Sequence, residues 1–323
     1  MDTFMVTGGS GFIGSALCDY LLNKYKDVRV INVSKQTYAT NLKIIRFLEE
    51  YGERYISKAL DFNDTLHLYE LLTKYDVKRL YHLGAETHVD RAFLYPQDFL
   101  WSNVQGTFSI LEAIRFMKQK PTLYYMGTDE VFGDVTTGFK REDEVLHPEN
   151  PYVASKVAAE AYCITWKCCF DVPLVIGRSM NVFGQRQNPE KLVAKIITHI
   201  LLDKQYTLYT GNSLRGWSYV YDTVDAIDTI TTKGNNGDVY HIPPSCFKTV
   251  NEVNESILDI TGKHSLFLGY KGERLKDDHR YALNCVRMRR ELKWEPKMSW
   301  DQGIKQTIKW YEANRELWVN EVI

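Results

Sequence analysis

The chain has 323 residues, of which 44% are hydrophobic and 25% charged, a composition typical of a globular protein with one large α/β unit or two domains. Its formal net charge is −1, so no overall positive field attracts nucleic acid or an anionic membrane surface. The six cysteines show no spacing typical of a metal site, and no apolar run is long enough to span a bilayer. Because the sequence starts directly with a strand and shows no leader, we expect a cytoplasmic protein. From the cysteine spacing we expect no bound metal.

A glycine-rich turn follows the first predicted strand, Phe4 to Val6, and opens the first predicted helix. From Thr7 to Ser15 the sequence reads TGGSGFIGS. Glycine permits the backbone angles of such a turn and lets a pyrophosphate approach the helix N-terminus, while the last glycine lets helix and strand pack closely. Plain structural turns are also glycine-rich, but the position between a strand and a helix favours a dinucleotide site. We expect its contacts at Gly8, Gly11, Phe12, Ile13 and Gly14.

The second predicted strand, Val28 to Val33, ends at Ser34. An acidic residue that grips the adenosine ribose is expected about 20 residues beyond the glycines. Serine can still hydrogen-bond a ribose hydroxyl, but it lacks the charge that repels a 2′-phosphate, so NADP remains an alternative to NAD. A predicted helix, Leu42 to Tyr51, then leads to a short strand ending at Asp61, which could accept a hydrogen bond from the adenine amine or cap a helix.

Strands and helices continue to alternate along the next part of the chain. The predicted strand Arg79 to Ala85 ends in small residues that allow close approach of a cofactor, and it runs into the polar cluster Glu86 to Asp90. A predicted helix from about Asn103 to Lys118 and a strand from Leu123 to Met126 follow. This alternation predicts an α/β fold with a doubly wound parallel (Rossmann) sheet, whose ligands lie at the carboxyl ends of the strands.

Two groups of residues carry the predicted chemistry. Thr128, Asp129 and Glu130 leave the end of a strand and bring a hydroxyl and two carboxyl groups to the ligand edge. Tyr152 and Lys156 are four residues apart and therefore share one face of a predicted helix. A lysine beside a tyrosine is expected to lower the tyrosine pKa, so that the phenolate can take a proton from an alcohol while hydride leaves the same carbon. An ordinary surface Tyr/Lys pair is the alternative.

With these motifs the chain resembles the extended short-chain dehydrogenases/reductases that act on nucleotide sugars, and most closely the dTDP-glucose 4,6-dehydratases. The resemblance covers nearly the whole chain. Besides the glycine turn, it rests on HLGAETHVDR from His82, TDEVFG from Thr128, PYVASK from Pro151, NVFG from Asn181, PEKL from Pro189, RGWSYV from Arg215 and RYA from Arg280. Its most specific part is the Thr-Asp-Glu triplet, because 4-epimerases carry small or hydroxyl residues at the two acidic positions.

The resemblance implies NAD as cofactor and a homodimer in which the helices containing Asn103 and Tyr152 form a four-helix contact. It divides the chain into an NAD-binding Rossmann domain, residues 1–178 plus about 216–240, and a smaller nucleotide-sugar-binding lobe, about 179–215 and 241–323. The further cofactor contacts that it implies are Ser34, Asp61, Phe62, Leu83, Ala85, Tyr152 and Lys156. The substrate contacts that it implies are Thr87, His88, Asn181, Lys191, Leu192, Arg215 and Arg280.

The implied reaction is internal redox on a nucleotide-linked glucose, in deoxysugar biosynthesis. Tyr152 deprotonates the C4 hydroxyl, Glu130 removes the C5 proton, and protonated Asp129 donates to the departing C6 hydroxyl, while Thr128 orients the C4 oxygen. Two neighbouring carboxyl groups suit an acid and a base because their like charges push their pKa values apart. The alternatives are a dehydratase for UDP-glucose or another hexose nucleotide, a 4-epimerase, and a cofactor-sensing module without activity, which would tolerate loss of Tyr152 or Lys156.

Several positions depart from the family pattern, mostly on the nucleotide side of the substrate, and they put the identity of the base in doubt. They are Ser34 for an acid, Gly84 for alanine, Gly127 for serine, Gly216 for aspartate and His241 for asparagine. The loop before Arg215 is one residue short, and Arg274 to Asp277 lacks a Pro-Gly-His sequence. Lys195 and Arg274 are further candidates to hold a diphosphate, although a solvated surface charge explains any single one of them.

Overall fold

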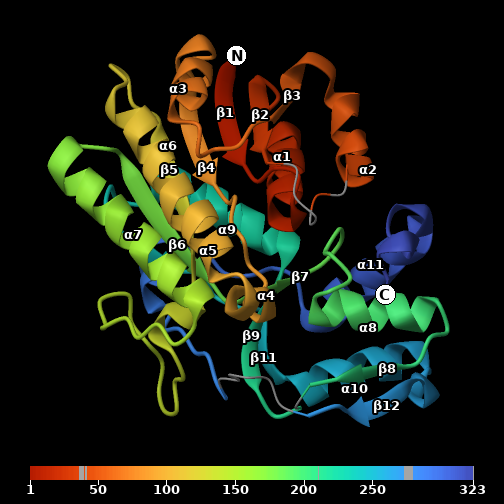
Figure 1. The fold of residues 1–323 in the computed structure, drawn as a ribbon. Coiled ribbons are helices and arrows are strands. Elements are labelled where there is room, and N and C mark those ends of the chain that lie inside the picture. The colour runs from red at the N-terminus through yellow and green to blue at the C-terminus, as the bar shows by residue number, and fades with distance from the viewer. Residues whose placement is uncertain (36–39, 41, 210, 273–278, 323) are drawn as a thin grey trace.

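A seven-stranded parallel sheet forms the centre of the larger part of the molecule (Figure 1). The computed structural model describes residues 1–35, 40, 42–209, 211–272 and 279–322. The strand order is β10-β6-β5-β4-β1-β2-β3, and every neighbouring pair in it is parallel. The strands are β1 (Asp2–Thr7), β2 (Val28–Ser34), β3 (Tyr55–Ala59), β4 (Val77–His82), β5 (Thr122–Thr128), β6 (Leu174–Ser179) and β10 (Val239–His241).

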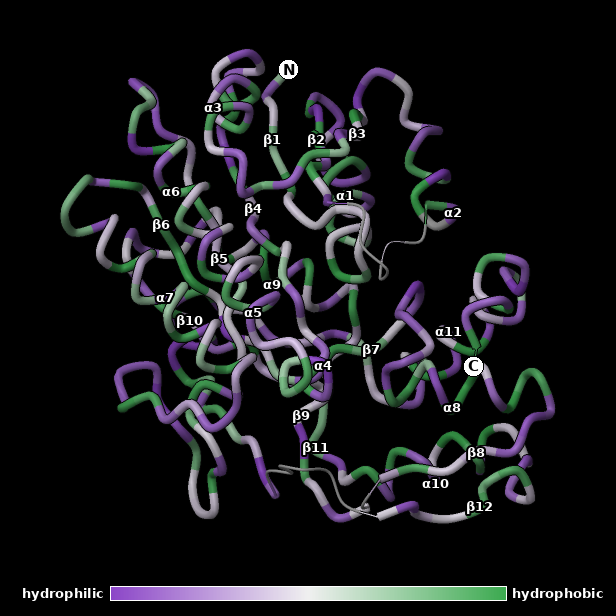
Figure 2. Tube along the Cα trace, in the orientation of Figure 1, coloured by the Kyte–Doolittle hydropathy of each residue, from purple (hydrophilic) through white to green (hydrophobic). Residues whose placement is uncertain are grey.

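Helices cover both faces of this sheet, which explains why its strands are apolar on both sides. Alternate residues of β1 point to opposite faces, so that Val6 packs with α1 and α9 while Met5 packs with α3, α6 and α7. In Figure 2, β6 is drawn largely in the colour of hydrophobic residues. The helices are α1 (Phe12–Lys24), α3 (Thr65–Lys74), α6 (Gly106–Arg115), α7 (Pro151–Phe170) and α9 (Val220–Lys233).

The strand order reverses between β1 and β4, and this position sets the place of the site. The chain winds from β1 outward to β3, and then returns to place β4 on the other side of β1. The connections that leave the carboxyl ends of β1 and β4 therefore diverge to opposite faces and open a crevice between them. Short helices, α4 (Val89–Leu94) and α5 (Pro96–Phe99), follow β4 at this edge.

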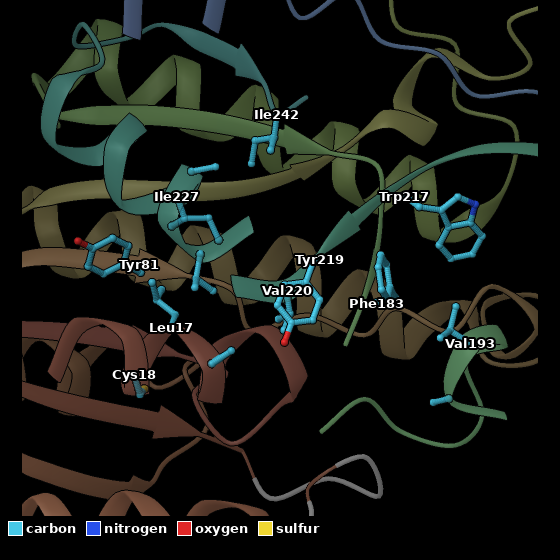
Figure 3. Close-up of a cluster of buried hydrophobic side chains, with 14 of the residues drawn as sticks. Leu17, Cys18, Tyr81, Phe183, Val193, Trp217, Tyr219, Val220, Ile227 and Ile242 are labelled. Carbon is cyan, nitrogen blue, oxygen red and sulfur yellow. The ribbon is translucent and has the colours of Figure 1, made fainter. Parts of the chain in front are cut away.

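A smaller lobe lies beyond the carboxyl ends of the strands (Figure 1). It contains a three-stranded sheet, β11-β9-β7, and a two-stranded one, β12-β8. Figure 3 shows one hydrophobic cluster that begins at Leu17 and Tyr81, on the face of the large sheet covered by α1 and α9. It continues to Phe183 and Trp217 in the lobe. The elements are β7 (Asn181–Phe183), α8 (Leu192–Leu201), β8 (Tyr206–Leu208), β9 (Leu214–Tyr219), β11 (Cys246–Thr249), α10 (Val250–Thr261), β12 (Phe267–Tyr270) and α11 (Trp300–Ala313).

The predicted doubly wound fold is confirmed, but two of the predicted helices differ in detail. The helical segment predicted from Leu42 to Tyr51 is confirmed as helical, but only α2 (Leu42–Ile45) is an α-helix, and it continues as a 3-10 segment, Arg46–Arg54. Within it, Gly52 adopts a φ of 58°, which turns the chain toward β3. The helix predicted from Asn103 begins as the π-helical segment Leu100–Gln105 and continues as α6. Within the described ranges, no helix is long and apolar enough to cross a membrane.

Candidate active site

The glycine turn is shaped so that side chains would not fit in it. Gly8 has a φ of 71°, and a Cβ there would lie 2.7 Å from the Cα of Gly84 on the neighbouring strand end. A Cβ on Gly14 would lie 2.1 Å from the carbonyl oxygen of Gly8. Gly11 is the N-cap of α1 and has no side chain to cover the first free N–H groups of that helix. The turn therefore offers a bare backbone at a helix N-terminus, which fits the pyrophosphate of the predicted dinucleotide.

A cavity of about 470 Å³ extends from this turn, past the ends of β4, β5 and β6, to the smaller lobe. It brings together most of the residues predicted from the sequence to bind cofactor or substrate or to act in catalysis. On the cofactor side, Gly8, Gly11, Phe12, Ile13, Gly14, Ser34, Phe62, Leu83 and Ala85 line it. On the catalytic and substrate side, Thr87, His88, Thr128, Asp129, Glu130, Tyr152, Lys156, Asn181, Lys191 and Leu192 line it.

The carboxyl group of Asp129 is buried at the end of β5. The Thr128 hydroxyl donates to Asp129 Oδ1 over 3.2 Å, and Asp129 Oδ2 has no hydrogen-bond partner among the described residues. Burial, and secondly the negative charge of Glu130, raises the pKa of Asp129 to about 8, against the opposing charge of Arg215. At neutral pH Asp129 is therefore a carboxylic acid on the cavity wall.

Tyr152 and Lys156 both line the cavity from α7, as their spacing predicts. The expected lowering of the tyrosine pKa by the lysine is wrong for this structure. Burial, and secondly the charge of Glu130, raises the pKa of Tyr152 above its usual value, although a hydrogen bond with Thr128 opposes the rise. Lys156 Nζ instead donates to the Met126 carbonyl over 2.7 Å, and burial lowers its pKa to about 8.

Two contacts join the segment after β4 to the start of α8 across the cavity. Lys191 Nζ donates to the Thr87 carbonyl over 3.3 Å, and His88 Nε2 lies 3.7 Å from a carboxylate oxygen of Glu190. His88 also caps α4, because its Nδ1 accepts from the Arg91 amide. These contacts connect the large domain to the lobe at the position predicted to hold the sugar nucleotide.

Three of the predicted ligand-binding residues do not line the cavity. Asp61 pairs with Lys35 and accepts hydrogen bonds from Asn63, and it is Asp64 that caps α3, so the capping alternative for Asp61 is wrong. Arg215 lies over the ring of Tyr281 at 4.3 Å, and Arg280 donates to the Val135 carbonyl. The two arginine segments adjoin, through a bridge between Leu214 and Arg280. Arg274 lies outside the described residues.

The structure adds three charged residues to the cavity wall that the sequence patterns missed, Lys35, Arg186 and Glu321. Arg186 is buried, adopts a φ of 71°, and donates to the Tyr221 hydroxyl over 2.6 Å. Glu321, near the C-terminus, also lines the cavity. Nothing in the sequence links residue 321 to the glycine turn, since only the folding of the lobe brings it there. Arg186 lies two residues after Gly184, the last residue of the NVFG stretch on which the resemblance partly rests, so the sequence could have indicated it.

Four of the five departures from the family pattern have packing explanations. A Cβ on Gly84 would lie 2.6 Å from the Phe62 ring, one on Gly127 2.9 Å from the Arg178 side chain, and one on Gly216 2.1 Å from Met180 Sδ. His241 is fully buried, where its Nδ1 donates to the Asn284 carbonyl and Arg178 donates to its Nε2. Burial lowers the pKa of His241 to about 3, so it is neutral.

Comparisons with known proteins agree with the geometry. The family described as GDP-mannose 4,6 dehydratase matches residues 5–307. The dTDP-glucose 4,6-dehydratase of Haemophilus influenzae is 34% identical over 97% of this chain and 99% of its own length, and that of Salmonella typhimurium is 30% identical over 98% and 94%.

Solved structures give the same result. The structure of dTDP-glucose 4,6-dehydratase from Bacillus anthracis in complex with NAD has 32% identity and a TM-score of 0.91, covering 99% of this chain and 100% of that one. The corresponding enzyme from Streptomyces venezuelae with NAD bound has 31% identity and a TM-score of 0.93, covering 99% of each chain. A UDP-glucose 4-epimerase from Thermotoga maritima, at 24% identity and a TM-score of 0.89 over 97% of this chain and 99% of that one, shares the fold.

Proposed function

The chain belongs to the dTDP-glucose 4,6-dehydratase family, and from that membership we propose that it converts dTDP-glucose to dTDP-4-keto-6-deoxyglucose as an NAD-dependent hydro-lyase. The observation that carries this proposal is the buried acid Asp129 beside Glu130 at the end of β5. Water elimination needs both an acid and a base, whereas C4 epimerisation leaves two adjacent carboxyl groups without a necessary role.

Each residue of the site has a defined part in this reaction. NAD held at the glycine turn would supply the hydride acceptor at C4 and the hydride donor at C6, and a proton would return to C5 with that hydride. Tyr152 accepts the C4 hydroxyl proton, with Thr128 orienting that oxygen, and the resulting ketone acidifies the C5 proton that Glu130 removes. Asp129 protonates the C6 hydroxyl as it leaves as water. Because the pKa of Tyr152 is raised, its hydroxyl needs a nearby positive charge before it can lose its proton and act as a base. Lys156 lies one helical turn away on α7 and carries such a charge.

The cavity suits a sugar nucleotide placed between the two parts of the chain. The polar residues Thr87, His88 and Asn181 lie on its wall with Lys191, and the catalytic triplet and the glycine turn line the same cavity. Arg215 is close enough for its charge to lower the pKa of Asp129. A diphosphate bound at Arg215 would therefore bring the hexose near the acid.

The test of this function is a substrate panel. The pure protein is incubated with dTDP-, UDP-, GDP- and CDP-glucose, and the 4-keto-6-deoxy product is followed by its absorbance in alkali. We expect dTDP-glucose to give the fastest reaction. Preference for another nucleotide base would change the assigned substrate but not the reaction class. In contrast, 4-epimerisation without dehydration would contradict the proposal.

We further propose a homodimer formed by α7 and the helical segment from Leu100 to Arg115. Large apolar side chains on these elements are exposed in the single chain, among them Leu100 at 59%, Trp101 at 55% and Ile164 at 44%. We expect the wild type to sediment as a dimer and Trp101→Glu to shift it toward monomer. A monomeric wild type would contradict this assembly.

Asp129→Asn should stabilise the protein while it impairs dehydration. The folded-state pKa of Asp129, about 8, exceeds its ordinary value of 3.8, so the stability that the protonated acid provides is lost as the pH rises from about 4 to about 8. Asparagine does not ionise. The variant should therefore gain at most about 5 kcal/mol over the wild type at pH 8 and little at pH 4.

Urea unfolding at the two pH values measures this difference. The exposed Asp301 on α11 offers a control, since Asp301→Asn makes the same chemical change on the surface. An equal gain at both pH values would mean that Asp129 is not a buried neutral acid.

A further inference from the structure

The end of β2 carries a neutral group where dinucleotide sites that select NAD carry an acid. That acid binds the ribose hydroxyls and repels a 2′-phosphate. Here Ser34 is the last residue of β2, is buried, and lines the cavity beside the glycine turn. No carboxylate therefore extends from the strand at this position.

The Ser34 hydroxyl belongs to a hydrogen-bond network of neutral groups. It accepts a hydrogen bond from the Ser10 amide over 3.0 Å and donates to Asn32 Oδ1 over 2.9 Å. The Asn32 amide in turn donates to the hydroxyls of Ser10 and Tyr55, at 2.9 and 3.0 Å. The single donor of Ser34 is thus used within the protein, so Ser34 is left with its second lone pair to accept a hydrogen bond from a ribose hydroxyl.

The charged side chain next to this network is a cation. Lys35 lines the cavity, and its Nζ lies 3.0 Å from Asp61 Oδ2, with both side chains partly exposed, at 43% and 37%. Two amide groups of Asn63 also donate to the other oxygen, Asp61 Oδ1. Asp61 therefore keeps hydrogen bonds if Lys35 turns to another anion. The charge of Lys35 also acts on Glu86, where it lowers the pKa against the larger effect of burial.

We propose that this dinucleotide site accepts NADP as well as NAD, with Lys35 as the residue that meets the 2′-phosphate. A carboxylate at position 34 would add a negative charge next to that phosphate, whereas the Ser34–Asn32–Ser10 network adds none. A phosphate also forms a charge-assisted hydrogen bond with an ammonium group, which replaces the exposed Lys35–Asp61 pair.

Calorimetric titration of the dinucleotide-free protein with NAD and with NADP, without any sugar nucleotide, tests this proposal. We expect the two dissociation constants to agree within about tenfold. Ser34→Asp should weaken NADP binding about a hundredfold and leave NAD binding within a few-fold. Lys35→Ala should weaken NADP about tenfold and NAD much less.

Lys78 provides the matched control, because it also pairs with an aspartate, Asp76, and is 42% exposed, but it does not line the cavity. Lys78→Ala should leave both affinities unchanged. Rejection of NADP by more than about a hundredfold in the wild type, or equal losses of both dinucleotides in Lys35→Ala, would overturn the proposal. Because the wild-type ratio and the Lys35 variant suffice, the conclusion survives if Ser34→Asp does not fold.

This proposal is independent of the proposed reaction. A protein that binds both dinucleotides but dehydrates none of the nucleotide glucoses would refute the reaction and leave the cofactor inference intact. A dehydratase that binds only NAD would support the reaction and refute the cofactor inference.

Discussion

Glu130→Gln should stop the reaction after oxidation at C4 and before loss of water. Oxidation relies on Tyr152, Thr128 and the cofactor, all of which remain, whereas a neutral amide cannot take the C5 proton. Mixing the variant with substrate should produce the absorbance of reduced nicotinamide and a 4-ketoglucose nucleotide, with overall turnover lowered at least about a hundredfold.

Isotope exchange makes this result specific to the base. In heavy water the wild type should place deuterium at C5 of the product, because the proton removed there returns from exchangeable groups. The Glu130→Gln enzyme should show little exchange at that carbon.

Glu86 serves as the comparison residue, because it is a second carboxyl group on the cavity wall, and burial raises its pKa. Glu86→Gln should still release 4-keto-6-deoxy sugar. If it stalls and Glu130→Gln does not, Glu86 is the base, and the role assigned to Glu130 is wrong.

Tyr152→Phe should lose at least about a hundredfold in turnover through failure of the first step. The ring of Tyr152 packs edge-on against Phe99 at 6.2 Å, and phenylalanine keeps that contact. The variant should therefore fold and bind dinucleotide normally but form no reduced nicotinamide when substrate is added. Only the hydroxyl, hydrogen-bonded with Thr128 in this structure, is removed.

Tyr124→Phe is the matched control for this change. Tyr124 is also a fully buried tyrosine, but it belongs to the cluster on the α1 and α9 side of the sheet and does not line the cavity. Loss of the Tyr124 hydroxyl should leave the rate of the oxidation step nearly unchanged. Near-normal oxidation by Tyr152→Phe would instead remove Tyr152 from the mechanism.

Local patterns in the sequence determined the fold class and most of the cavity wall. A glycine turn between a strand and a helix has few structural uses, and Gly8 and Gly14 lie where a side chain would collide with backbone. The four-residue spacing of Tyr152 and Lys156 is a property of any helix, so both had to lie on one face of α7. The triplet that begins at the last residue of β5 reached the ligand edge because parallel strands end together there.

The tertiary structure alone decided how these groups ionise and which partners they have. The protonation of Asp129 depends on its burial, and the Tyr152 pKa is raised because burial outweighs the hydrogen bond with Thr128. The Ser34 hydroxyl accepts a hydrogen bond from the Ser10 amide and donates to Asn32, partners that no sequence pattern indicated. Burial and long-range contacts are properties of the packed chain, so no local pattern encodes them.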